Sequence, residues 1–361
     1  MKLPAYEELI PEQLTVMDYP LDLPLFVAGP PGSGKTVLAV RRADAASEAK
    51  KEVALITFNR MLRRLAALLS ADGPVHETMQ KFVWHDYFRR TGQEPESPVY
   101  DPYRYVWIKM LENLKARNSK PRLDHVVVDE GQDLPAGFFE YLNQHAAVVL
   151  SVFADEEQAL GWRKTSLSEI QFAGALPQPV LLKENHRNRP EIAALAHHFH
   201  RGLLPATMTR RAPIGQLPRL IRISEESTVE FIGTWFENRG GTVGIVVDRN
   251  DFGERIHSEL LRRLPNRRID IYTFHRNNED TIALLDEGVT ILNKESVKGQ
   301  EFDTLFILQL ERFIPCATDA MRRAMYMMCA RARDYLFLMH SASLSRDGEA
   351  ALPGPNILER E

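Results

Sequence analysis

Residues 29–36 read Gly-Pro-Pro-Gly-Ser-Gly-Lys-Thr and stand between an apolar run at 25–28 and a helical pattern at 36–50. Glycines in such a turn let backbone N–H groups surround a phosphate, while the lysine neutralises its charge and the threonine hydroxyl can bind Mg²⁺. A strand before the loop and a helix after it are the context that this chemistry requires. The stretch therefore predicts a nucleotide phosphate site made by Gly29, Gly32, Ser33, Gly34, Lys35 and Thr36, with Thr36 as a metal ligand.

Short apolar runs alternate with helical patterns along the whole chain, which predicts an α/β fold with parallel sheets. In the first half we expect strands at 25–28, 53–57, 125–128, 148–153 and 180–182, and helices at 36–50 and 59–69. In the second half we expect strands at 220–223, 243–247, 269–272, 289–292, 304–308 and 335–338, and helices at 191–201, 229–237, 252–264 and 318–332. Residues 166–179 contain Gly174, Pro177 and Pro179 and predict a crossing between two units. The expected domains are therefore 1–175, with a short helical insert at about 83–120, and 176–361.

The composition excludes several classes of protein. The chain has 361 residues, 44% of them hydrophobic and 26% charged, so collagen-like and wholly disordered proteins are excluded. Lys plus Arg (45) nearly balance Asp plus Glu (49), so any site for a polyanion must be local. The two cysteines form no zinc-binding pattern, and the N-terminus lacks the apolar stretch of a signal peptide, so we expect a cytoplasmic location.

Two carboxylates, Asp129 and Glu130, come directly after the expected strand at 125–128. Asp129 is placed to hold Mg²⁺, and Glu130 can accept a proton from an attacking water. Two acids after a strand are by themselves typical of a solvated turn, but beside a phosphate loop they predict hydrolysis of the bound nucleotide rather than its storage.

Residues 129–133, Asp-Glu-Gly-Gln-Asp, resemble the second motif of UvrD/Rep-type superfamily 1 helicases, which are ATP-driven motors on single-stranded nucleic acid. Other stretches resemble further motifs of that family in the same order along the chain: Ile10 to Gln13, Asp155 to Gln158 with Trp162 and Arg163, Asn185 to Asn188, 290–303 and Tyr326 to Arg333. Three positions depart from the usual motifs, namely His186, Glu295 and Ala330. The large inserted domains of the family are nearly absent from this chain.

The resemblance implies two tandem RecA-like P-loop NTPase domains, with ATP and Mg²⁺ in the cleft between them. It assigns Gln13 and His186 to the adenine, Glu301 to the ribose, and Gln158 to sensing of the γ-phosphate. It assigns Arg187 and Arg331 to the charge that develops during hydrolysis, and Arg163 to a link between the nucleic acid and the nucleotide.

The resemblance also implies a track for a single strand, because bases stack on aromatic rings while amides and cations follow the phosphates. The expected contacts are Phe58, Asn59, Arg63, Thr78, Lys81 and Trp162. Some of these have a structural alternative: Phe58 and Trp162 can be packing residues, and the arginines after Phe58 can be a solvated helix face.

Three functions remain compatible with the sequence. The first is an ATP-dependent motor on single-stranded nucleic acid, a translocase or helicase for which DNA is favoured over RNA without the sequence deciding between them, with 3′ to 5′ travel suggested by the resemblance. The second is an ATPase switch subunit that regulates a protein partner such as a nuclease. The third is a nucleic-acid-binding protein that does not hydrolyse ATP, against which stands the presence of Lys35, Asp129 and Glu130.

Overall fold

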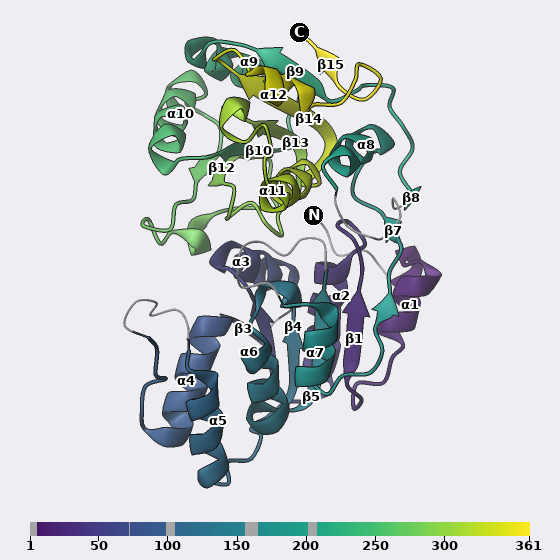
Figure 1. The fold of residues 1–361 in the computed structure, drawn as a ribbon, viewed down its shortest axis with the longest axis vertical. Helices are drawn as coiled ribbons and strands as arrows, with labels where there is room; N and C mark the ends of the chain where they lie inside the picture. The colour runs from purple at the N-terminus through teal and green to yellow at the C-terminus, as the bar shows by residue number, and fades with distance from the viewer. Residues whose placement is uncertain (1–5, 72, 99–104, 156–164, 201–207) are drawn as a thin grey trace. The chain divides into compact units, whose positions relative to one another are not determined.

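The computed structural model describes residues 6–71, 73–98, 105–155, 165–200 and 208–361. The chain separates into two compact units: an N-terminal unit that contains the described residues up to Pro30 and residues 34–183, and a C-terminal unit that contains residues 184–361 together with residues 31–33. Figure 1 labels the helices and strands of both units.

The N-terminal unit contains a six-stranded parallel sheet in the order β3-β2-β4-β5-β1-β6. Its strands are β1 (Leu25–Ala28), β2 (Val53–Thr57), β3 (Val75–Thr78), β4 (Leu123–Val128), β5 (Ala147–Ala154) and β6 (Val180–Leu181). Its helices are α1 (Pro11–Met17), α2 (Lys35–Glu48), α3 (Arg60–Leu69), α4 (Met79–Thr91), α5 (Trp107–Ala116), α6 (Ala136–Tyr141) and α7 (Leu167–Ala173).

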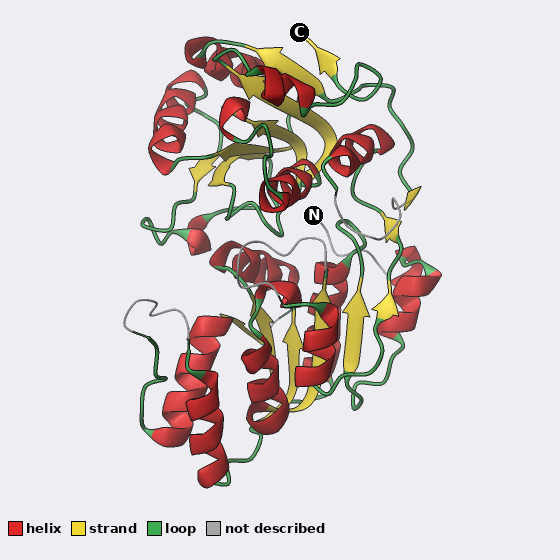
Figure 2. Ribbon diagram, in the orientation of Figure 1, coloured by secondary structure: helices red, strands yellow, loops and turns green. Residues whose placement is uncertain are grey.

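Helices cover this sheet, so its four inner strands β1, β2, β4 and β5 are buried along most of their length, as parallel strands are. Alternate residues of the strands, such as Ile56, Val126 and Val152, pack against side chains from α4, α5, α6 and α7 in one apolar core. Helix α2 packs against β2, β4 and β5. Figure 2 shows the strands of this sheet with helices beside them.

The C-terminal unit contains a seven-stranded parallel sheet in the order β11-β12-β10-β13-β14-β9-β15. Its strands are β9 (Arg219–Arg222), β10 (Thr242–Val247), β11 (Ile269–Ile271), β12 (Gly288–Asn293), β13 (Phe302–Ile307), β14 (Ala332–His340) and β15 (Glu359–Arg360). A separate parallel pair joins β7 (Glu184–Asn185) and β8 (Met208–Thr209). The helices are α8 (Pro190–His198), α9 (Glu225–Arg239), α10 (Asn250–Arg263), α11 (Asp319–Cys329) and α12 (Arg346–Ala350).

Helices α9 and α10 supply apolar side chains to the core of this second sheet, among them Ile232, Phe236, Ile256 and Leu260. Helices α8 and α11 pack against each other and against β14. The two all-parallel sheets confirm the α/β class, and they are consistent with tandem RecA-like domains.

Three expectations need correction. Strand β6 pairs with β1, so the first unit extends to Lys183 and the division falls eight residues after the expected boundary at 175/176. The expected crossing contains α7, which begins because Ser166 and Glu169 form a capping box. The helix expected at 318–332 ends at Cys329, since Phe302 N–H bonds the carbonyl of Arg331 and draws the chain into β14.

The expected insert at about 83–120 is part of the first unit's core. Helix α4 buries Phe82 and Val83, and α5 buries Met110 and Leu114, all in the core that covers the sheet. These helices therefore belong to the body of the fold.

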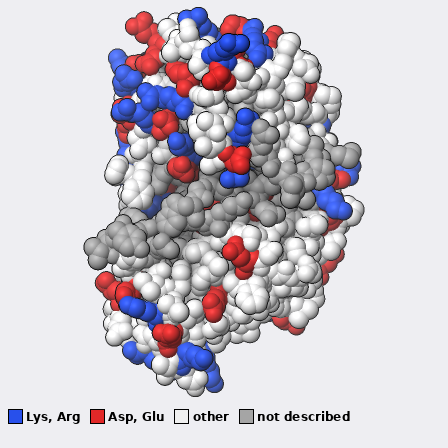
Figure 3. All heavy atoms as spheres, in the orientation of Figure 1, with Lys and Arg blue, Asp and Glu red and all other residues white. Residues whose placement is uncertain are grey.

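Charged side chains of both signs gather over α9 and α10 on the face drawn in Figure 3. Many of them are paired within the unit, as where Arg263 bonds both Glu230 and Glu237. Among the described helices, none is both long enough and apolar enough to cross a membrane.

Candidate nucleotide site

The carboxyl ends of three adjacent strands bring the predicted phosphate and metal residues together. Because all strands of the first sheet are parallel, their carboxyl ends lie at one edge. There β1 leads to Gly29, β4 leads to Asp129, and β5 leads to Asp155. Strand β5 lies between β1 and β4, so these chain ends are separated by one or two strand spacings of about 4.8 Å each.

The loop after β1 needs glycine for its backbone. Gly34 has φ +91°, in the left-handed region, and stands directly before α2. A Cβ atom at Gly34 would come within 2.8 Å of Nε2 of Gln13. The residue predicted to contact adenine therefore lies against the phosphate loop within the same unit, where its Oε1 also accepts from Ile10 N–H at 3.3 Å.

Lys35 is buried and points back into the loop. Its Nζ donates to the carbonyls of Gly29 (2.7 Å) and Pro30 (2.8 Å) and lies 3.4 Å from Oδ2 of Asp155. The ammonium is thus held by oxygen atoms at the place where phosphate oxygens are expected. Sequence reasoning gave Asp155 no role beyond its place in a motif, yet it supplies the charge partner of Lys35.

Asp129 and Glu130 are both buried beside this loop. Burial raises the pKa of Asp129, the charge of Glu130 raises it further, and Thr36 and Lys35 oppose the shift. Among the described atoms, Oδ2 of Asp129 is buried without a hydrogen-bond partner. A buried carboxylate pair with one unbonded oxygen fits a divalent cation, which would supply the missing positive charge.

Gln132 links the expected general base to the next strand. Its Nε2 donates to Oε2 of Glu130, and its Oε1 accepts from the N–H of Asp155 at 2.8 Å. The Glu130 backbone is left-handed, with φ +56°, which turns the chain sharply after β4. The sequence contains one indication that Gln132 orients Glu130, because Gln132 is a polar residue two positions after it in the motif. The hydrogen bond between their side chains was not predicted.

In the C-terminal unit the structure brings Arg187 and Glu301 together. Nη2 of Arg187 lies 2.5 Å from Oε1 of Glu301. Burial alone would raise the pKa of Glu301, but the charge and hydrogen bond of Arg187 outweigh it and lower the pKa. The expected γ-phosphate arginine and the expected ribose ligand are therefore paired with each other.

Asn188 holds the segment of Arg187 against the start of β14. Its Nδ2 donates to the carbonyls of Ala330 (3.1 Å) and Ala332, and its Oδ1 accepts from Asn185. Arg187 also donates to the carbonyl of Ala330, at 3.3 Å. Residues far apart in the sequence are thereby joined at the amino ends of β13 and β14.

Of the other residues predicted for the nucleotide, Arg331 and His186 lie within the described residues, and Gln158 and Arg163 do not. Arg331 is 1% exposed, and its Nε donates to the carbonyl of Met327 at 3.0 Å. Nε2 of His186 lies 3.8 Å from a carboxylate oxygen of Glu184. Gln158 and Arg163, together with Trp162 of the nucleic-acid set, lie outside the described residues.

The remaining nucleic-acid candidates lie toward the β3 end of the first sheet. Asn59 caps α3 by accepting from Leu62 N–H at 2.7 Å, and Phe58 is half-buried against the core. Thr78 ends β3 and stands directly before α4, and Lys81 is exposed on α4. Phe58 thus has in part the packing role that was its structural alternative. Arg63 is half-buried on α3.

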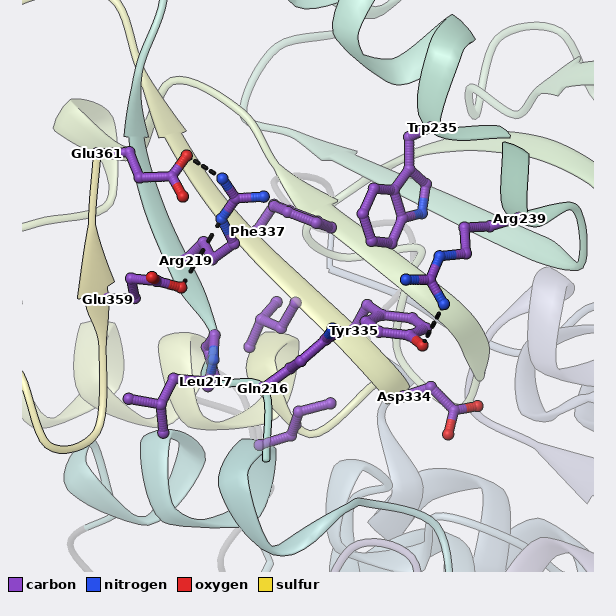
Figure 4. Close-up of a pocket in the computed structure, with 13 residues that line it drawn as sticks. Gln216, Leu217, Arg219, Trp235, Arg239, Asp334, Tyr335, Phe337, Glu359 and Glu361 are labelled. Atoms are coloured by element: carbon purple, nitrogen blue, oxygen red, sulfur yellow. Dashed lines mark hydrogen bonds and ion pairs between the residues drawn. The ribbon is translucent and has the colours of Figure 1, made fainter. Parts of the chain in front are cut away.

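A pocket of about 350 Å³ in the C-terminal unit contains none of the predicted site residues. Figure 4 shows Arg219 between Glu359 and Glu361, and Arg239 beside Tyr335. Nη1 of Arg239 donates to the hydroxyl of Tyr335 at 2.8 Å. Arg219 and Arg239 thus already have ion-pair or hydrogen-bond partners within this unit.

Comparison with models of protein families finds no match, and comparison with curated proteins finds none. Among solved structures, the chain resembles the C-terminal domain of a possible DNA helicase from Lactobacillus plantarum WCFS1, with 19% identity and a TM-score of 0.35 over 48% of this chain and 98% of that chain. It also resembles the PRRSV helicase, with 12% identity and a TM-score of 0.44 over 91% of this chain and 54% of that chain. Both TM-scores lie below 0.5, and the fold described above rests on this chain's own sheets and motifs.

Proposed function

We propose that this chain is an ATP-hydrolysing motor on single-stranded nucleic acid, of the UvrD/Rep type within superfamily 1, acting as a DNA translocase or helicase. The observation that supports this function best is that the Lys35 loop after β1 and the pair Asp129 and Glu130 after β4 lie at the same edge of the sheet, with β5 between them and one carboxylate oxygen of Asp129 left unbonded. A 3′ to 5′ direction and a cytoplasmic location are part of the proposal.

Hydrolysis would use residues of the first unit in distinct roles. Thr36 and Asp129 would hold Mg²⁺, which neutralises phosphate charge when it is bound. Lys35 would exchange its carbonyl contacts for phosphate oxygens, and Gln13 would contact the adenine beside Gly34. Glu130, oriented by Gln132, would accept the proton of the attacking water.

The C-terminal unit would contribute positive charge to the transition state. An arginine supplied to a phosphoryl-transfer site can be worth about 10³ to 10⁵ in rate. Arg187 would have to leave Glu301 to act in this way, so we expect nucleotide binding to compete with that ion pair. Arg331 is the second arginine in the proposal.

The test is steady-state ATP hydrolysis with and without single-stranded DNA, at low salt, with Lys35→Ala as the blank. We expect a stimulation of at least about tenfold that falls as salt rises, because phosphate contacts weaken with salt. A robust rate that ignores both DNA and RNA would refute the motor and favour an ATPase switch that acts on a protein partner such as a nuclease.

A further inference from the structure

Helix α4 carries two large aromatic side chains on its outer surface. Trp84 is 39% exposed and Phe88 is 43% exposed, although most large apolar residues of this unit are buried. Their rings are parallel, with an interplanar angle of 3° and centroids 5.2 Å apart. The two residues are four positions apart, so they are neighbours on one face of the helix.

The core does not need these two rings. The opposite side of α4 already buries Phe82, Val83 and Tyr87 in the core. Because Trp84 and Phe88 stay partly exposed to water, they do not gain the full free energy of burial that those three residues gain. Exposed aromatic side chains that lie together are typical of a binding surface.

Cations lie beside the rings, on the side of Phe88. At 100° per residue, Lys81, His85 and Arg89 lie about 20°, 60° and 100° around the helix from Phe88, and Lys81 and Arg89 are exposed. Two carboxylates of the neighbouring sequence are already engaged: Glu77, which precedes the helix, bonds His85 of this arc at 3.0 Å, and Asp86 is buried. Within the described helix, this arc therefore combines open rings with positive charge and carries no carboxylate.

We propose that the arc formed by Lys81, Trp84, Phe88 and Arg89 is a stacking platform for the bases of single-stranded nucleic acid. Bases stack on ring faces in a sequence-tolerant way, and the two cations would follow the phosphates. The proposal rests on the proposed function and deepens it by placing the strand on α4.

The platform continues the track predicted at the start of the same helix. Helix α4 begins next to Thr78, at the carboxyl edge of the sheet, and rises about 1.5 Å per residue, so Phe88 lies about 15 Å farther along. Figure 1 shows α4 running beside α5. A strand that contacts Thr78 can thus extend along α4 to both rings. The flanking cations favour this polyanion over an apolar partner helix, which would gain nothing from them.

The experiment measures binding of fluorescent oligo-dT and oligo-U by anisotropy, without nucleotide. The test variant is Trp84→Leu with Phe88→Leu, which keeps both side chains apolar and keeps helix propensity but removes both rings. The matched control is Trp84→Tyr with Phe88→Tyr, which keeps both rings. We expect Kd to rise at least tenfold for the leucine variant and to stay within about threefold for the tyrosine variant.

A second measurement tests the cations. Changing Lys81→Gln and Arg89→Gln removes two phosphate contacts, so the slope of log K against log salt should fall in magnitude by about 1.4. The ring variants should leave that slope unchanged. Thermal unfolding near that of the unmodified chain would show that all variants fold.

The outcomes separate this inference from the proposed function. Equal Kd values for the leucine variant and the unmodified chain would overturn the platform, even if DNA stimulates hydrolysis. Absence of binding to either oligonucleotide would overturn it as well. Weaker binding of the leucine variant beside hydrolysis that ignores DNA would support the platform and refute the motor.

Discussion

Replacing Gln132 with leucine should damage hydrolysis by releasing the Glu130 carboxylate. Leucine nearly keeps the volume of the buried glutamine but makes neither of its hydrogen bonds. The bond to a charged carboxylate is worth about 1.5–3 kcal/mol, and the N–H of Asp155 left without its acceptor costs about 1–3 kcal/mol. We therefore expect the free energy of unfolding to fall by about 2.5–6 kcal/mol.

The catalytic effect should be separable from this loss of stability. A general base that is no longer oriented contributes less, so we expect kcat for ATP to fall by about 10- to 100-fold while KM changes little. The charged form of the Glu130 carboxylate also loses a donor, so the acidic limb of the pH–rate profile should move to higher pH. A purely structural role for Gln132 would not move that limb.

Gln144 offers a matched control, because its Nε2 bonds a carboxylate oxygen of Glu140 at 2.9 Å on the surface. Gln144→Leu makes the same chemical change where solvent replaces the lost bond, so stability should change by less than about 0.5 kcal/mol and kcat should not change. The assays are urea unfolding and ATP hydrolysis across pH. Unchanged kcat in folded Gln132→Leu would refute the role given to this side chain.

Three further changes have expected outcomes. Burial and the charge of Glu130 raise the pKa of Asp129 to about 7, so the unmodified chain should lose stability as pH rises through that value. Asp129→Asn should not show this loss, and Mg²⁺ should restore stability to the unmodified chain alone. Both are measured by thermal unfolding at pH 6 and 8. Asn188→Ala removes the donor to two carbonyls and should lower the free energy of unfolding by about 2–4 kcal/mol in urea. Glu301→Gln leaves Arg187 without the charge of its half-buried partner and should cost about 2–4 kcal/mol at pH 7. Since the folded pKa of Glu301 is lowered, this last difference should shrink as pH falls below about 4.5.

Each of these has an outcome that would contradict it. Parallel pH dependence of Asp129→Asn and the unmodified chain would mean that Asp129 does not titrate as stated. Stability of Asn188→Ala within about 0.5 kcal/mol of the unmodified chain would show that the carbonyls find other donors. A Glu301→Gln penalty that persists unchanged at pH 3 would show that charge is not its origin.

The α/β class was predictable because its signals are local. A buried parallel strand appears as a short apolar run, so most strands of both sheets were located to within one or two residues, including β1 and β4. The glycine loop was equally local, because the positive φ of Gly34 reflects a conformation that few other residues adopt. Two weaker elements, β3 and α7, were not predicted. Strand β3 begins with an exposed valine, and the capping box of α7 lies in a segment whose glycine and prolines indicated a loop.

The sequence by itself determined which residues could carry the chemistry, and only the tertiary structure decided which of them meet. Glycines, lysine and paired carboxylates can be recognised from residue type and order, because their chemistry is a property of each side chain. The contact of Lys35 with Asp155 depends instead on β5 lying beside β1, and the pairing of Arg187 with Glu301 depends on the chain between them folding back. Strand order is set by burial summed over a whole sheet, and that sum cannot be read from any single stretch of sequence.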